Sequence, residues 1–120
     1  MKAYVTRDSV SAGDDVLAPH AREVRIHAEP TMRDLVDQAL KISQLPRISG
    51  GKATWALSSS IPLAVVAQEW DEPELVSQFP LDLGLLDHSN DEIRMHWSYF
   101  AQLDPDLVLE VLRRLRLQAE

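Results

Sequence analysis

The order of apolar patterns along the first 69 residues most restricts what this chain of 120 residues can fold into. In Lys2–Val10, and again in Arg22–Glu29, apolar and polar residues alternate with the period of two that is typical of a strand with one buried face. Thr31 then begins a helical pattern, because Asp34 stands at the N3 position of a capping box and apolar residues follow at spacings of three and four. The sequence therefore predicts two strands followed by one helix.

Two more strands are predicted after this helix. The helix is expected to end before Pro46, because proline disfavours helical dihedral angles in the residue that precedes it. Lys52–Ser58 alternates again, with Trp55 on its apolar face. Ile61–Gln68 is apolar almost throughout, which is typical of a strand with both faces covered. We therefore expect Ile61–Gln68 in the interior of the sheet.

Taken together, residues 1–69 resemble the β-grasp (ubiquitin-like) fold, in which a small sheet wraps around a single helix. The opening residues 1–6, and Arg22–Glu29 running into Pro30 and Thr31, carry the resemblance. It implies an α+β domain with a mixed four-stranded sheet and one packed helix. It also implies that the last strand, Ile61–Gln68, lies centrally and parallel to the first.

The resemblance also suggests which uses of this fold to expect. Ubiquitin-like modifiers and sulfur carriers act through a C-terminal Gly-Gly, whereas this sequence ends in Ala119-Glu120. Ferredoxin-like members bind an iron–sulfur cluster through four cysteines, and the sequence has none. The use that remains is a rigid platform for binding another protein, although fold alone does not fix function.

Residues 71–120 are expected to form a loop and a helical extension that packs on the core of residues 1–70, so that the chain is one domain. Ser89–Glu92 resembles a second capping box and predicts a helix. Its expected apolar side consists of Ile93, Trp97 and Phe100. Asp104 and Pro105 predict the start of a last helix, Asp104–Gln118. This helix is expected to bury Leu107 or Val108, together with Val111, Leu112 and Leu115.

Charge is unevenly distributed along the chain, whose formal net charge is −7. No Lys or Arg lies between Lys52 and Arg94, while eight acidic residues do, so this stretch carries −8. Binding to nucleic acid is therefore not expected, and a basic protein is the natural partner. The alternative is that these acids only keep the surface solvated. The aromatic side chain of Trp70 among acids could anchor a partner, or else pack against the core. The predicted partner-binding residues are Glu69, Trp70, Asp71, Glu72 and Glu74.

No catalytic arrangement can be recognised, and we predict no catalytic residue, cofactor or metal. The sequence has no G-x-S-x-G motif, and its run of three serines falls in a predicted hairpin turn. One cluster has residue types that bind metals: Asp87, His88, Asp91, Glu92 and His96. On the predicted helix, Glu92 and His96 would share one face, but acids near a helix N-terminus also stabilise its dipole.

The leading hypothesis is a non-catalytic protein-binding module, such as a small bacterial adaptor or an immunity or inhibitor protein. It would engage a basic partner through the acidic stretch 69–92. The alternative is a homodimer or assembly subunit joined through Arg22–Glu29 or Asp104–Gln118. A metal-dependent enzyme built on His88, Glu92 and His96 is a distant third. We expect a cytoplasmic protein without membrane contact, because no signal-peptide pattern or bilayer-length apolar run is present.

Overall fold

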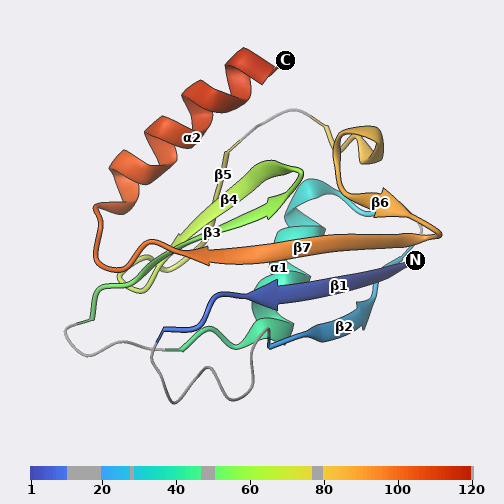
Figure 1. Cartoon of the computed structure of the whole chain (residues 1–120), viewed down its shortest axis with the longest axis horizontal. Helices are drawn as coiled ribbons and strands as arrows, with labels where there is room; N and C mark the ends of the chain where they lie inside the picture. Colours follow the sequence, from blue (N-terminus) through green and yellow to red (C-terminus); the bar gives the residue numbers. More distant parts are fainter. Residues whose placement is uncertain (11–19, 28, 47–50, 77–79, 120) are drawn as a thin grey trace.

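In the computed structural model, the chain adopts an α+β fold with a mixed seven-stranded sheet and two α-helices (Figure 1). The structure describes residues 1–10, 20–27, 29–46, 51–76 and 80–119. The strands are β1 Lys2–Arg7, β2 Arg22–Arg25, β3 Thr54–Ser59, β4 Ile61–Ala67, β5 Glu74–Leu75, β6 His88–Ser89 and β7 Glu92–Tyr99. The helices are α1 Met32–Ser43 and α2 Pro105–Ala119, and Leu83–Leu85 forms a short 3-10 helix. The α+β class is confirmed, whereas the predicted count of four strands is wrong.

The first two strands and the helix that follows them begin where the sequence predicts, but β1 ends at Arg7 and β2 at Arg25, earlier than the predicted Lys2–Val10 and Arg22–Glu29. β1 and β2 pair antiparallel, with Ala3 opposite Val24. Thr31 caps α1: its hydroxyl accepts a hydrogen bond from the backbone N–H of Asp34 at 3.1 Å, and the Asp34 carboxylate accepts one from the Thr31 N–H at 2.9 Å. This capping box satisfies two backbone donors that the helix itself cannot pair. Ala28, at the end of the predicted second strand, lies outside the described residues.

The centre of the sheet is formed by β7 rather than by β4. The strand order is β2-β1-β7-β3-β4-β5, with β6 paired to β7. Figure 1 shows β7, in orange, between β1 and β3. It runs parallel to β1, with Val5 opposite Met95, and antiparallel to β3, with Leu57 opposite Trp97. The prediction that Ile61–Gln68 lies beside the first strand is therefore wrong, because β4 pairs with β3 and β5.

The prediction that a helix begins at Ser89–Glu92 is also wrong, because this segment forms a β-hairpin. Ser89 pairs with Glu92, and the two residues between them, Asn90 and Asp91, have φ angles of 53° and 59°. Two consecutive residues with positive φ make the type I′ turn, whose twist suits a hairpin, and Asn and Asp tolerate this conformation. Beyond the turn, every second residue of β7 is buried, namely Ile93, Met95 and Trp97.

The two helices cover different parts of the sheet. α1 buries Leu35, Val36 and Ala39 against a main core built from β1, β3, β4 and β7. α2 packs over β4, and a second, smaller core joins the two elements. This second core consists of Ala56, Val65, Val76, Val108 and Leu109. β4 therefore has apolar contacts on both faces, which explains its nearly continuous apolar pattern.

Residues 71–120 are not simply an extension packed on a separate core, because β7 supplies the central strand of the sheet. The predicted last helix is present as α2. Its burial is only partly as predicted. Val108 is buried and Leu112 is half-buried, whereas Val111 and Leu115 are exposed.

Candidate functional site

An open hollow of about 710 Å³ lies where the connection from β4 to β5 meets the first turns of α2. Its lining residues are Glu69, Trp70, Asp71, Glu72, Glu74, Asp106 and Leu109. The structure therefore places all five predicted partner-binding residues around one concave surface, which we call the acidic hollow. Asp106 and Leu109 complete it from a distant part of the chain, and no signal in the sequence pairs them with the other five.

Backbone contacts hold the connection that forms this hollow. The chain turns after β4, where the backbone N–H of Trp70 donates a hydrogen bond to the carbonyl oxygen of Ala67 at 3.0 Å. Pro73 is buried, and its carbonyl oxygen accepts a hydrogen bond from the guanidinium of Arg33 on α1 at 3.0 Å. β5 then pairs with β4, which sets Glu74 opposite Val65. The acidic side chains thus project from a connection that is fixed at both ends.

The acidic hollow keeps a surplus of negative charge. Five of its seven lining residues carry carboxylates, and all five are exposed. Two arginines contact the same region, but both donate to backbone carbonyl oxygens: Arg33 to that of Pro73, and Arg113 to that of Leu75 at 2.8 Å. Among the described residues, none of the five carboxylates forms an ion pair. A cationic ligand would therefore find carboxylates that no internal ion pair occupies.

Trp70 lies between the second core and the acidic hollow. The side chain is half-buried and packs against the second core, yet it also lines the acidic hollow. On another side it borders an apolar crevice of about 190 Å³ that also includes Trp55 and Leu45. Trp55 and Trp97 are buried in the main core, as predicted.

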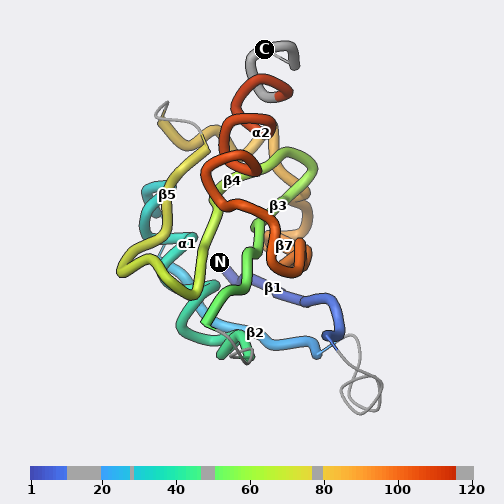
Figure 2. The backbone as a smooth tube through the Cα atoms, turned by 90° about the vertical axis from the view of Figure 1, so that its left-hand side faces the viewer, coloured from blue at the N-terminus to red at the C-terminus, as the bar shows by residue number. Residues whose placement is uncertain are grey.

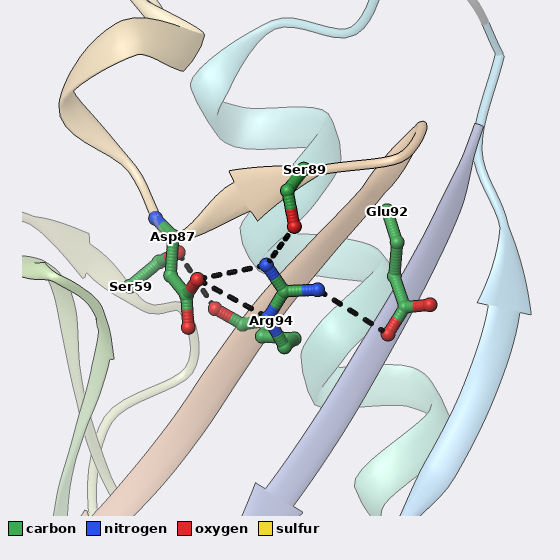
Figure 3. A network of polar contacts seen from close by, with 5 residues as sticks. All are labelled: Ser59, Asp87, Ser89, Glu92 and Arg94. Carbon is green, nitrogen blue, oxygen red and sulfur yellow. Dashed lines mark hydrogen bonds and ion pairs between the residues drawn. The ribbon is translucent and has the colours of Figure 1, made fainter.

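The other acids of the −8 stretch have structural partners. Arg94 on β7 donates to Asp87 at 2.9 and 3.1 Å and to Ser89 at 2.6 Å, and lies 3.8 Å from Glu92 (Figure 3). The hydrogen bond to Asp87 raises the pKa of the Arg94 guanidinium. The buried hydroxyl of Ser59 joins this network to β3, because it donates to the Arg94 carbonyl oxygen and accepts from the Asp87 N–H. This network fastens the β6–β7 hairpin.

Asp82 and Asp91 also have polar partners within the chain. The carboxylate of Asp82 accepts a hydrogen bond from the N–H of Gly84 at 2.9 Å and so caps the 3-10 helix. Asp91 lies 3.6 Å from the N-terminal ammonium group. The structure thus divides the eight acids evenly: four have local partners, and four line the acidic hollow together with Asp106.

The candidate metal ligands do not converge on a common point: Asp87 and Glu92 share the Arg94 guanidinium. Glu92 and His96 lie four residues apart on a strand, which separates their Cα atoms by about 13 Å instead of one helical turn. Glu92 faces Arg94, and His96 contacts Asp8. Within the described ranges, no three residues of the His, Cys, Asp or Glu types form a group that could hold a metal ion.

A chain of hydrogen bonds around His96 is not evident from the sequence. The ring nitrogens lie 2.7 Å from the Thr6 hydroxyl and 2.8 Å from a carboxylate oxygen of Asp8, while the other Asp8 oxygen accepts from the Tyr99 N–H at 2.9 Å. A hydroxyl, an imidazole and a carboxylate in this order also occur in nucleophilic sites. Here the hydrogen bonds join Thr6 and Asp8, at the end of β1, to His96 and Tyr99 on β7, and we assign them this structural role.

Comparison with models of protein families, with curated proteins and with solved structures found no match to this chain. Neither helix in the described part of the chain combines the length and the apolar character that crossing a membrane requires.

Proposed function

We propose that this protein is a non-catalytic binding module whose acidic hollow binds a basic segment of a partner protein. The observation that carries the proposal is the set of five exposed carboxylates around one concave surface, none of which forms an ion pair within the described part of the chain. Lys and Arg side chains of a partner would complement this charge, and opposed fields speed the encounter of two proteins. The half-buried ring of Trp70 would supply an apolar anchor beside the charges.

We also propose that the fold is of the β-grasp type, with β7 as its last strand. β7 lies centrally and parallel to β1, and α1 covers one face of the sheet, which supports this proposal. A rigid sheet with a fixed connection at its edge suits a platform for another protein. The role we favour is that of a small bacterial adaptor or an immunity or inhibitor protein, acting in the cytoplasm.

Charge reversal in the acidic hollow tests the binding role. The wild-type protein is immobilised, basic proteins are captured from a native bacterial lysate, and the association rate of each is measured as a function of salt. The double variant Glu72→Lys/Glu74→Lys is expected to associate roughly tenfold more slowly at low salt and to show a flatter salt dependence, because the steering charge is removed.

A matched control separates the hollow from total charge. Glu23 and Asp37 are exposed acids on β2 and α1, so Glu23→Lys/Asp37→Lys changes the net charge by the same amount elsewhere. This control is expected to retain most of the wild-type rate. Equal slowing by both double variants would show that total charge, rather than the acidic hollow, governs binding.

A further inference from the structure

One face of α2 carries an exposed apolar stripe. Five large hydrophobic side chains are exposed in the described part of the chain, and four of them follow one another at intervals of four residues. These four form the α2 stripe: Leu103 (55% exposed), just before the helix begins, and Leu107 (55%), Val111 (48%) and Leu115 (54%) on the helix. The fifth, Leu85, lies in the 3-10 helix. Single exposed leucines are ordinary, whereas a continuous row along one helix face marks a contact surface.

The α2 stripe is separate from the face that holds α2 on the sheet. Val108 and Leu109 are buried against β3 and β4, and the Arg113 guanidinium donates to the carbonyl oxygens of Leu75 and Val76. α2 therefore has two apolar faces, of which the structure covers one. Figure 2 shows α2 running along the strands on the outside of the molecule.

The charges along α2 indicate what covers this stripe. On the side of α2 that carries the stripe, the N-terminal half has the acidic residues Asp104 and Glu110 and the C-terminal half has the basic residue Arg114. Asp106 lines the acidic hollow and Arg113 is bound to the sheet, so neither belongs to this side. Beside the stripe, Glu110 and Arg114 have side chains that are 58% and 75% exposed and form an ion pair of 2.7 Å. Two copies of α2 in antiparallel orientation would set the acidic half of each against the basic half of the other. Parallel copies would oppose like charges and like helix dipoles.

We propose that the α2 stripe is the interface of a homodimer in which two copies of α2 pack antiparallel about a twofold axis at Val111. Leu107 of one copy then faces Leu115 of the other, and Val111 faces its own counterpart. The interface is self-complementary in both shape and charge, which is what a twofold contact requires. The proposal is independent of the acidic hollow, because Asp106 and Leu109 project from other sides of the helix.

The absence of cysteine from the sequence allows a direct test by disulfide formation. Val111→Cys is expected to give covalent dimers rapidly under mild oxidation, because the two side chains meet at the axis. Leu107→Cys alone is expected to stay unlinked, since eight residues of helix separate the two copies of position 107 by about 12 Å. An equimolar mixture of Leu107→Cys and Leu115→Cys is expected to form crossed dimers.

The reverse pattern, with Leu107→Cys linking to itself, would refute the antiparallel arrangement. Leu85→Cys is the matched control, because Leu85 is also an exposed leucine but lies off the stripe (45% exposed). If Val111→Cys linked no faster than Leu85→Cys, the interface would be refuted.

Sedimentation equilibrium provides a second measure without a covalent bond. The wild-type protein is expected to dimerise reversibly, and Val111→Glu to raise the dimer dissociation constant at least about tenfold, because it buries a charge at the axis. Leu85→Glu is expected to dimerise like the wild type. Circular dichroism confirms that each variant is folded. A wild-type chain that stays monomeric up to millimolar concentration would overturn the proposal.

Discussion

At the scale of single residues, the contacts of Asp34 predict how the stability of the fold depends on pH. Its pKa is lowered from the usual 3.8 first by the hydrogen bond from the Thr31 N–H, then by the one with the Thr31 side chain, and further by His27, 3.1 Å away. A carboxylate whose pKa is lower in the folded state stabilises the fold above its unfolded pKa. That contribution disappears as the pH falls through the folded pKa.

We therefore expect Asp34→Ala to lower the free energy of unfolding at neutral pH and to have little effect in acid below the pKa of folded Asp34. Urea denaturation over a series of pH values measures this difference. Asp37→Ala is the control, because Asp37 is an exposed acid of the same helix outside the capping box. Parallel pH profiles for the two variants would contradict the role of Asp34.

At the scale of the element, Ser89–Tyr99 shows how one sequence can satisfy two local patterns. Ile93, Trp97 and Phe100 have helical spacing, while Ile93, Met95 and Trp97 have the spacing of a strand. The local pattern therefore does not decide between a helix and a strand for this segment. β1 and β3 each offer an unpaired edge to this segment, and hydrogen bonding to both makes the strand the more stable structure.

Substitutions at Asp91 distinguish the hairpin from a helix. Because φ is 59° there, Asp91→Gly is expected to preserve or increase stability, and Asp91→Val to lower it by about 1–2 kcal/mol. In a helix, glycine would instead destabilise by about 1 kcal/mol relative to a good helix former. Denaturant midpoints measure both variants. A glycine variant less stable than the valine variant would contradict the turn assignment.

For the whole molecule, the sheet joins segments that are far apart in the chain. β1 and β7 lie side by side although about 90 residues separate them, and β7 completes the main core through Ile93 and Trp97. Residues 1–70 therefore lack the strand that would link β1 to β3. We expect this part of the chain to be unstable without the remainder.

Two truncations test this dependence. The chain 1–87, which lacks the β6–β7 hairpin and α2, is expected to be unfolded, with no cooperative thermal transition by circular dichroism. The chain 1–103 keeps the whole sheet and loses only α2, so it is expected to retain strand signals with a lower midpoint, because Val65 and Ala56 lose their cover. Cooperative folding of 1–87 would show that the N-terminal part is an independent core.

Local sequence is enough to place β1, β2, α1 and the start of α2, because caps, proline positions and side-chain periods act within a few residues. The local sequence also identifies the acidic stretch, and the apolar pattern of β4 indicates that both faces of this strand are covered by other residues. The position of β7 and the strand order depend on hydrogen bonds between distant segments, which no local pattern contains. The same holds for the acidic hollow. In the folded chain, Asp87 and Glu92 pair with Arg94. Glu72 and Glu74 form no ion pair with any described residue, and Asp106 lines the same hollow as they do.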